Sequence, residues 1–312
     1  MDRKIGMYGG SFNPLHLGHV NDIIEASNMC GKLYVVLSYS LNRNEIFYKE
    51  RYKWLKKLTN DLDNVEVIEV EDKARQKEKY DWQQGAEDIK KIIGKEIDIV
   101  FCGDDYKGTN RYESLYPNSE VYYFDRSIIN ISSTQIRENP YKYINYLPKI
   151  VQSYYVKKVV VVGTESCGKS TLVRNLAKVY NTNYVREVGR DICEEAGGID
   201  NMQPNDFVDI LLEHKVLELD GVKQANKVMF IDTEASITLY YLNLLYEHEH
   251  LDDINNLGNS IANLSDYDLY LFLEPDVKWV QDGTRTYGDD EVRKKNNVML
   301  KDMLKERKDE PR

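Results

Sequence analysis

Two histidines near the start of the chain have the types and the spacing of groups that bind an anion. They are His16 and His19, which lie at the end of the run GGSFNPLHLGH at positions 9–19. Its glycines would let the backbone approach a phosphate without a Cβ in the way. His16 and His19 would share one face of a helix start, where both can donate hydrogen bonds to one anion. Such donors suit a transferring phosphoryl group, and an ordinary turn with two surface histidines is the alternative.

A second pattern for phosphate binding lies at positions 131–137, which read ISSTQIR. Hydroxyl residues at a helix start, here Ser132 and Thr134, cap its free N–H groups, and that end of the helix attracts anions. Arg137 follows one turn later and adds a fork of donors suited to a triphosphate. This stretch therefore predicts a second set of phosphate contacts.

Two side chains between these patterns are candidates for a phosphorylated ring substrate. Trp82 offers an aromatic face that could stack on a flat ring, although a tryptophan at a helix start more often serves packing. Arg51 and its neighbour Lys49 could contact a phosphate. Solvated charges on a helix face would look the same, so both interpretations stay open.

The second half of the chain holds a complete P-loop pattern, GTESCGKST, at positions 163–171. Gly163 and Gly168 would open the loop so that backbone N–H groups can wrap phosphates. Lys169 would reach the terminal phosphates, and the Ser170 hydroxyl could coordinate magnesium. An apolar run before the loop and a helical pattern after it favour a nucleotide-binding site.

Acidic and basic residues follow later strands of the same half. Asp232 ends an apolar run, which is where a P-loop fold places its second magnesium contact, and Glu234 could orient an acceptor hydroxyl. The run WVQDGTR at 279–285 is a polar glycine turn that ends in Arg285. It could form a lid that brings an arginine to the developing charge, and a surface turn is the alternative.

Short apolar runs must supply the strands that position these residues. They alternate with helical patterns, which predicts an α/β fold with parallel sheets flanked by helices on both faces. Ligands then bind beyond the carboxyl ends of the strands. The expected strands span 5–8, 33–37, 65–70, 97–101, 121–124, 159–162, 228–231 and 269–273. The expected helices include 21–30, 51–58, 85–93 and 172–180.

Length and composition narrow the class of protein further. A chain of 312 residues predicts two domains, which we place at 1–155 and 156–312. The net charge of −10 argues against a mainly electrostatic nucleic-acid binder. The four cysteines lack metal-ligand spacing, and reduced thiols are expected. With no signal peptide and no apolar run near the ~18 residues of a membrane span, we expect a cytoplasmic protein.

The motifs together resemble a known family. Residues 9–19 are similar to the GxFxPxHxGH signature of the nucleotidyltransferase superfamily, and residues 131–137 to its ISxTxxR motif. The first motif is carried by Phe12, Pro14, His16, Gly18 and His19. These motifs, followed by a P-loop kinase, resemble the NadR family over nearly the whole chain. Other pieces that match in order are 138–140, 156–159, 165–172, 230–233 and 279–285.

The resemblance implies a fold and two linked reactions. A Rossmann-like nucleotidyltransferase domain would be a nicotinamide mononucleotide (NMN) adenylyltransferase, and the P-loop domain a ribosylnicotinamide kinase. ATP would phosphorylate nicotinamide riboside to NMN, and NMN would then receive AMP to give NAD and pyrophosphate. ATP, NMN, nicotinamide riboside and NAD are the expected partners, with Mg²⁺ as cofactor. A homo-oligomer would be ordinary for the superfamily.

The resemblance also implies roles for single residues. His16 and His19 would bind the ATP phosphates and stabilise the transition state. Further ATP contacts of the first site would be Gly9, Ser11, Phe12, Ser132, Thr134 and Arg137. The candidates for NMN are Trp82 and Arg51. ATP in the kinase would contact Gly163, Gly168, Lys169, Ser170, Thr171 and Arg285. Lys169 and Asp232 would be catalytic, and Ser170 and Asp232 would bind the metal. The candidates for the riboside are Glu187, Arg190 and Glu234.

Three departures from the family pattern bear on these expectations. The first strand begins by residue 5, so we expect no N-terminal helix-turn-helix domain and no repressor role. Glu234 stands where aspartate is expected, which lengthens a side chain in the acceptor site. The chain stops at Arg312, where the family continues into another strand and helix. We therefore expect a kinase domain shortened at its C-terminus, with an exposed sheet edge.

Three other functions remain open at this point. The chain could be an adenylyltransferase whose second domain is inactive or only senses a nucleotide. It could be a regulatory sensor of NAD or ATP that turns over slowly. It could also be an adenylyltransferase with another acceptor, such as a pantetheine or flavin phosphate, because only the resemblance selects NMN.

Overall fold

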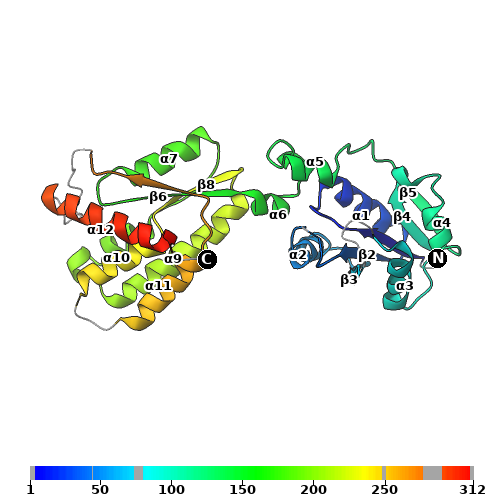
Figure 1. The fold of residues 1–312 in the computed structure, drawn as a ribbon, viewed down its shortest axis with the longest axis horizontal. Helices are drawn as coiled ribbons and strands as arrows, with labels where there is room; N and C mark the ends of the chain where they lie inside the picture. The colour runs from blue at the N-terminus through cyan, green and yellow to red at the C-terminus, as the bar shows by residue number, and fades with distance from the viewer. Residues whose placement is uncertain (1–3, 44, 74–79, 248–250, 277–289, 310–312) are drawn as a thin grey trace. The chain divides into compact units, whose positions relative to one another are not determined.

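The structure is a computed structural model, and it describes residues 4–43, 45–73, 80–247, 251–276 and 290–309. The chain divides into two compact units, Met1–Tyr154 and Tyr155–Arg312. Each unit has its own parallel sheet with helices packed against it (Figure 1). This arrangement confirms the predicted α/β class. The sequence placed the domain boundary one residue later, after Tyr155.

The described residues of the first unit form a five-stranded parallel sheet in the order β3-β2-β1-β4-β5. Its strands are β1 (Ile5–Gly10), β2 (Lys32–Tyr39), β3 (Val65–Glu71), β4 (Ile99–Gly103) and β5 (Glu120–Phe124). The chain changes direction across the sheet between β1 and β4. In such sheets the crevice beyond the carboxyl ends of these two strands is the place where ligands bind.

The helices of the first unit connect these strands. They are α1 (Leu17–Met29), α2 (Tyr48–Leu58), α3 (Trp82–Ile93), α4 (Arg111–Leu115), α5 (Ser133–Glu138) and α6 (Lys149–Gln152). Short 3₁₀ turns are η1 (Asp104–Tyr106), η2 (Ile144–Tyr146) and η3 (Ser153–Tyr155). The apolar face of α3 buries Ala86, Ile89 and Ile93 against Met7 and Val36 of the sheet. Helix α1 begins four residues before the predicted start, which places both histidines at its first turn.

The second unit holds a four-stranded parallel sheet in its described residues, in the order β7-β8-β6-β9. Its strands are β6 (Lys157–Gly163), β7 (Tyr184–Val185), β8 (Val228–Asp232) and β9 (Leu269–Leu273). Because β6 and β8 are parallel neighbours, the P-loop after β6 and Asp232 at the end of β8 emerge at the same edge of the sheet.

The helices of the second unit cover this sheet and build a separate apolar cluster. They are α7 (Lys169–Val179), α8 (Val188–Glu195), α9 (Pro204–Gln224), α10 (Ala235–Leu245), α11 (Asp252–Leu264) and α12 (Asp290–Asp309), with the 3₁₀ turn η4 (Ile199–Asn201). Helices α8, α9 and α10 bury Val188, Phe207 and Leu239, one from each helix, in the same cluster. Leu300 of α12 is fully buried in the core cluster that also contains Phe272 of β9.

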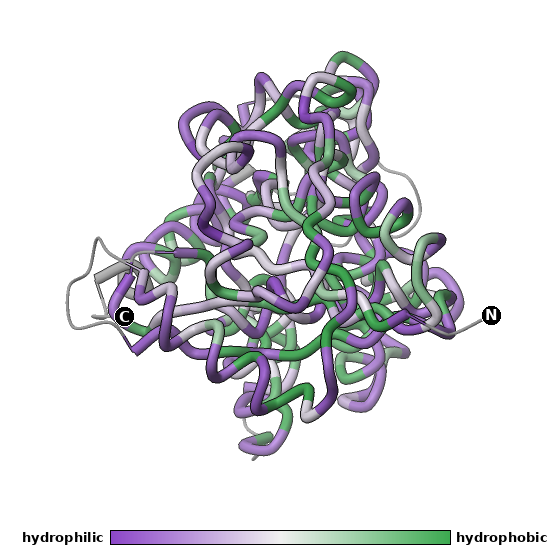
Figure 2. Tube along the Cα trace, turned by 90° about the vertical axis from the view of Figure 1, so that its right-hand side faces the viewer, coloured by the Kyte–Doolittle hydropathy of each residue, from purple (hydrophilic) through white to green (hydrophobic). Residues whose placement is uncertain are grey.

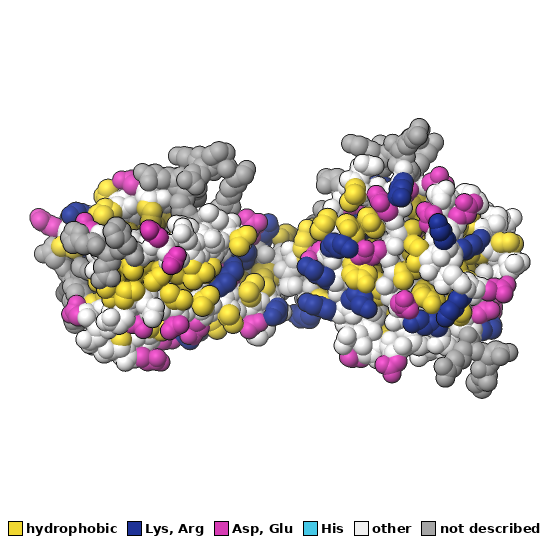
Figure 3. Space-filling view, turned by 90° about the horizontal axis from the view of Figure 1, so that it is seen from below, with side chains coloured by type: hydrophobic (Ala, Val, Ile, Leu, Met, Phe, Trp, Pro, Cys, Tyr) yellow, Lys and Arg dark blue, Asp and Glu magenta, His cyan; other side chains and the backbone are white. Residues whose placement is uncertain are grey.

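Hydrophobic and hydrophilic segments alternate along the described residues (Figure 2). Lys and Arg side chains are numerous on the first unit in Figure 3, and a band of hydrophobic side chains crosses the second unit. Helix α2 of the first unit carries four lysines in its sequence. In the second unit Leu212, Val216 and Leu219 of α9 are about half exposed. Among the described residues, no helix is long and apolar enough to cross a membrane.

Candidate active sites

His16 and His19 interlock at the start of α1. Each Nδ1 accepts the other residue's backbone N–H, at 3.4 Å for His16 Nδ1 and 3.3 Å for His19 Nδ1. The two rings stack with centroids 3.6 Å apart. A ring nitrogen that accepts a hydrogen bond cannot carry the proton, so each neutral imidazole holds it on Nε2. The pair therefore presents two N–H donors rather than one donor and one acceptor.

Both histidines are neutral at physiological pH. Burial, followed by the charge of Arg126, lowers the pKa of His16 to about 4. Burial also lowers the pKa of His19 well below its usual value, with further contributions from His16 and Arg126. Neutral donors stabilise negative charge through their dipoles. The net positive charge of this site must come from other residues.

These histidines face a cavity of about 460 Å³ beyond the carboxyl ends of β1 and β4. The predicted residues that line it are Gly9, Ser11, His16, His19, Trp82, Ser132, Thr134 and Arg137. Phe12 does not line the cavity. It is buried beneath it, and its ring meets that of His19 edge-on at 5.0 Å. Phe12 also has a positive φ of 47°, a strained conformation that the fold around it must hold.

The ISSTQIR segment is hydrogen-bonded to the loop between β1 and α1, which we call the histidine loop. Ser132 caps α5 by accepting the Gln135 N–H, and the Ser133 hydroxyl donates to the Pro14 carbonyl at 3.0 Å. Arg137 donates to the Asn13 carbonyl and to the Thr134 hydroxyl. Two segments more than a hundred residues apart therefore form one wall, with their donors on the same cavity.

Arg51 has a different place from the one predicted for it. Its side chain is 1% exposed, ion-pairs with Glu45 at 2.9 Å and donates to the Ser11 carbonyl at 2.6 Å. It is absent from the cavity lining in the described residues. Direct contact with NMN is therefore unsupported, because the guanidinium is already used to fix the backbone of the histidine loop.

Trp82 stands in an aromatic wall of the cavity. Its ring meets Tyr80, Tyr106 and Tyr112 edge-on, with centroids 5.0, 5.8 and 5.9 Å away. The Arg111 guanidinium lies 4.5 Å from the ring centroid. A tryptophan held by so many neighbours forms a rigid platform suited to a flat substrate ring.

Several residues of this cavity were missed by sequence reasoning. Arg43 and Arg126 line it and supply positive charge. Arg126 ion-pairs with Asp105 at 2.9 Å, and both side chains are about half exposed. Tyr106 and Tyr112 complete the wall. Arg126 follows β5 by two residues, so its place beyond a strand end was a usable signal, whereas the tyrosines follow no local pattern.

The P-loop of the second unit has the backbone that its glycines permit. Gly163 has φ 150°, and a Cβ there would lie 2.6 Å from the Leu273 carbonyl oxygen, while Gly168 has φ 92°. The Lys169 ammonium is buried and donates to the Thr164 carbonyl at 3.0 Å. Burial lowers its pKa, yet the charges of Glu187, Cys167 and Asp232 outweigh burial and raise it. Lys169 is therefore a permanent cation.

Asp232 and Ser170 fit a magnesium ion. Asp232 is almost fully buried, and the Ser170 hydroxyl donates to its carboxylate. Its Oδ1 is buried without a hydrogen-bond partner in the described residues. Burial, with the charge of Glu187, raises the pKa of Asp232 to about 6. A carboxylate oxygen and a hydroxyl beside a phosphate loop are the protein ligands that Mg²⁺ uses in P-loop sites.

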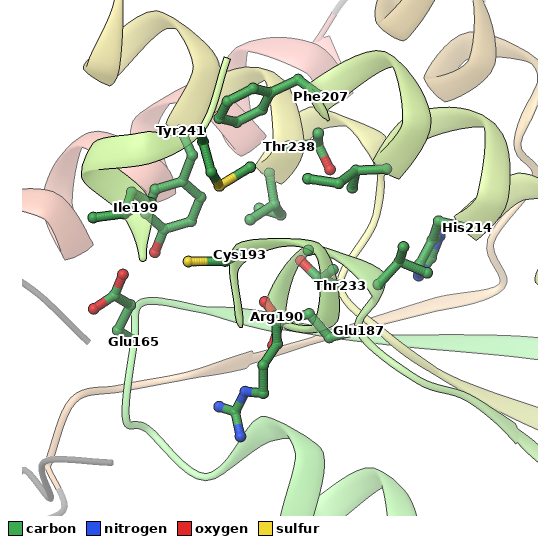
Figure 4. A pocket seen from close by; sticks show the side chains of 15 residues that line it. Glu165, Glu187, Arg190, Cys193, Ile199, Phe207, His214, Thr233, Thr238 and Tyr241 are labelled. Carbon is green, nitrogen blue, oxygen red and sulfur yellow. The ribbon is translucent and has the colours of Figure 1, made fainter. Parts of the chain in front are cut away.

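Two hollows meet beside the P-loop. One, of about 120 Å³, is lined by the predicted Gly168, Lys169, Ser170 and Thr171. The other, of about 110 Å³, lies between α8, α9 and α10 and is mostly apolar (Figure 4). Both are lined by Glu165, Glu187 and Arg190. The shared residues lie where an acceptor in the apolar hollow would meet a phosphate in the loop.

The remaining side chains of the apolar hollow were missed by sequence reasoning. Figure 4 shows Phe207, Tyr241 and Thr238 around it, with Thr233 and His214 at one end. They belong to α9, α10 and the segment after β8, and no local pattern connects them. Thr233 has a positive φ of 69°, which is unusual for a β-branched residue and marks the end of β8 as strained.

Two predicted kinase residues differ from expectation or cannot be placed. Glu234 is 1% exposed and caps α10 by accepting the Ser236 N–H at 3.1 Å. It lines neither hollow in the described part of the chain, so contact with an acceptor hydroxyl is unsupported. Arg285 and the rest of the proposed lid at 279–285 lie outside the described residues.

Comparison with family models finds one match for each unit. Residues 7–139 match the cytidylyltransferase-like family, and residues 158–310 match an AAA domain. The first match covers the histidine cavity and the second covers the P-loop and both hollows.

Comparison with curated proteins finds relatives of the whole chain and of its first unit. The trifunctional NAD biosynthesis/regulator protein NadR of Salmonella typhimurium is 30% identical over 320 residues, covering 97% of this chain and 77% of that protein. The phosphopantetheine adenylyltransferase of Mycoplasma mycoides is 36% identical over 138 residues, covering 43% of this chain and 95% of that protein.

Solved structures share the fold over nearly the whole chain. A NadR protein in complex with NR superposes with a TM-score of 0.77 at 21% identity, covering 97% of this chain and 86% of that one. A NadR protein in complex with NAD and AMP-PNP gives a TM-score of 0.80 at 22% identity, covering 97% and 88%.

Proposed function

Because this chain belongs to the NadR family, we propose that it is a bifunctional enzyme of NAD salvage. Its second unit phosphorylates nicotinamide riboside to NMN with ATP. Its first unit then adenylates NMN with a second ATP, giving NAD and pyrophosphate. The ligands named for the two solved NadR proteins, NR in one and NAD with AMP-PNP in the other, support this assignment. Both reactions consume ATP, and we place them in the cytoplasm.

The observation that carries the proposal is that each unit joins a phosphate-binding loop to an acceptor cavity. In the first unit the donors of His16 and His19 share a cavity with the Trp82 wall. In the second unit the P-loop meets an apolar hollow at Glu187 and Arg190. The product of the second unit is the substrate of the first, which gives a chemical reason for joining them in one chain.

We infer that adenylyl transfer relies on positioning and charge stabilisation. A phosphate oxygen of NMN attacks the α-phosphorus of ATP, the bond to the bridging oxygen breaks, and pyrophosphate leaves. The Nε2–H groups of His16 and His19 would donate to the phosphate oxygens as charge develops. Arg137 and Arg126 would supply the cationic charge that the neutral histidines lack. No protein nucleophile is needed.

We infer that the kinase reaction uses the residues where its two hollows meet. The riboside hydroxyl attacks the γ-phosphorus of ATP, the bond from that phosphorus to the β,γ-bridging oxygen breaks, ADP leaves, and the hydroxyl proton is released. Glu187 would accept the hydroxyl's hydrogen bond in place of Glu234, which is occupied as a helix cap. Lys169 would hold the terminal phosphates. Mg²⁺, held by Ser170 and Asp232, would neutralise part of the triphosphate charge.

A second candidate concerns only the acceptor of the first unit. The similarity to a phosphopantetheine adenylyltransferase favours a phosphopantetheine acceptor as the alternative to NMN. The Trp82 wall favours NMN, because a flat ring gains from stacking and a flexible pantetheine arm does not.

Product analysis tests the proposal. Purified protein with Mg-ATP is given nicotinamide riboside, NMN or 4′-phosphopantetheine in parallel, and products are separated by chromatography. We expect NAD from the first two reactions and no adenylated product from the third. NAD from NMN alone would leave an adenylyltransferase with an inactive or sensing second unit. Adenylated pantetheine as the main product would overturn the choice of acceptor.

A further inference from the structure

His214 joins the apolar hollow of the second unit to the strand end that carries Asp232. Its ring is buried, it lines that hollow, and its Nε2 lies 3.2 Å from the Asp232 carbonyl oxygen (Figure 4). A carbonyl can only accept, so Nε2 carries the proton and donates. His214 thus fixes the backbone of Asp232 from α9, the helix that precedes β8 in the chain.

The backbone that His214 contacts is strained. Thr233 has φ 69°, and its amide donates to the Val161 carbonyl of β6 at 3.0 Å. A β-branched residue keeps such a conformation only where the surrounding contacts impose it. The hydrogen bond to the preceding carbonyl is one of these contacts. The direction of the Asp232 carboxylate depends on this bend.

Helix α9 is itself a firm support for His214. Glu218 lies one turn further along the same face and is 3% exposed. Its carboxylate accepts the Tyr267 hydroxyl at 3.0 Å and lies 3.5 Å from the ammonium groups of Lys158 and Lys215. Because Lys158 belongs to β6, this network ties α9 to the strand that precedes the P-loop. The helix that carries His214 is therefore held against the strand that precedes the P-loop.

We propose that His214 is a positioning residue that orients Asp232 for the metal–nucleotide complex through its Nε2–H bond to the Asp232 carbonyl. The ring contacts the carbonyl of Asp232, so its effect on the carboxylate passes through the backbone. The proposal rests on the kinase function proposed for this unit. Partners that orient metal ligands in this way typically contribute a factor of about 10–100 in metal affinity.

Two substitutions of His214 test whether the N–H donor or the ring itself is required. In His214→Gln the side-chain amide nitrogen can reach the position of Nε2 and keep the bond. In His214→Asn the shorter side chain places its amide near the position of Nδ1 and loses it. Glu213→Gln changes the neighbouring residue, which is exposed and paired with Arg186, and is the matched control.

The readout is binding of Mn²⁺ with ADP, followed by electron paramagnetic resonance in the absence of riboside. A Lys169→Met chain gives the background from the first unit. We expect His214→Asn to raise the dissociation constant about tenfold. His214→Gln and Glu213→Gln should stay within about twofold of wild type. A thermal unfolding scan by circular dichroism that keeps the wild-type transition of the second unit reports that this unit is folded in each variant.

The outcomes distinguish this inference from the proposed kinase function. Equal affinity in wild type and His214→Asn would overturn the positioning role. An equal loss in His214→Gln and His214→Asn would also overturn it, since packing of the ring would then be the cause. If His214→Asn does not fold, His214→Gln alone decides, and a tenfold weaker affinity contradicts the inference. A wild-type chain that binds Mn²⁺–ADP but phosphorylates no riboside contradicts the kinase function only.

Discussion

The backbone N–H of His16 donates to Nδ1 of His19, and the backbone N–H of His19 donates to Nδ1 of His16. This reciprocal pair caps α1 and at the same time sets the tautomer of both rings. A local helix-capping device therefore prepares two Nε2–H donors for a phosphate.

The first prediction concerns the protonation of these rings. In ¹⁵N-labelled protein without nucleotide, His16 should titrate near pH 4, and its coupling pattern should be that of the Nε2–H tautomer, because burial opposes the charged form. His19 should also stay neutral at pH values at which an ordinary imidazole is protonated. His16→Asn and His19→Asn chains assign the signals. A midpoint near 6.5 for either ring, or the Nδ1–H tautomer, would contradict the account.

The second prediction concerns stability against pH. The folded state binds the His16 proton near pH 4, while the unfolded chain binds it near 6.5. The contribution to folding is therefore complete above about pH 6.5 and is lost as the pH falls toward 4. Its slope in this window is at most about 1.4 kcal/mol per pH unit. The free energy of unfolding in urea should differ less between pH 7 and pH 5 for His16→Asn than for wild type. An equal difference in the two proteins would contradict the lowered pKa of His16.

The third prediction concerns Arg51. Replacement by methionine should destabilise the first unit by about 3 kcal/mol, because it leaves the largely buried Glu45 without its cation. The Arg51→Met, Glu45→Gln double variant should recover part of this loss, and urea unfolding measures both. A raised KM for NMN with unchanged stability would instead restore the direct phosphate contact that the sequence predicted.

The fourth prediction concerns the aromatic wall. Trp82→Ala should raise the KM for NMN about tenfold, as expected for the loss of one ring-stacking contact. Trp82→Phe keeps an aromatic face and should change it much less. The KM for ATP should not move in either variant, since the predicted phosphate contacts lie on other segments. Equal changes in both KM values would show that Trp82 supports the fold rather than the acceptor.

Many residues that line the two candidate phosphate sites could be predicted, because their pattern is local. In the P-loop and in residues 9–19, the spacing of glycines and donors along the chain determines what the backbone can present. The histidines were correctly expected at a helix start, but the helical pattern itself was recognised only from residue 21, because the cap of α1 is His16, a residue type that carries no usual capping signal.

The acceptor sites were harder to predict because they depend on tertiary packing. Phe207 and His214 belong to α9 and Tyr241 belongs to α10, so they line one hollow only when these two helices pack together. Arg51 and Glu234 have the residue types of ligand contacts, yet both are buried. Arg51 donates to the backbone of the loop at Ser11, and Glu234 caps the start of α10. Neither outcome follows from local sequence.

The central claim is that one chain makes NMN in its second unit and converts it to NAD in its first. The most direct test gives nicotinamide riboside and Mg-ATP to wild type, Lys169→Met and His19→Asn, and follows NMN and NAD over time by chromatography. Wild type should form NAD, Lys169→Met should form neither product from riboside yet make NAD from added NMN, and His19→Asn should accumulate NMN. If Lys169→Met still makes NAD from riboside, or if His19→Asn makes NAD at the wild-type rate, the division of labour proposed for the two units is wrong.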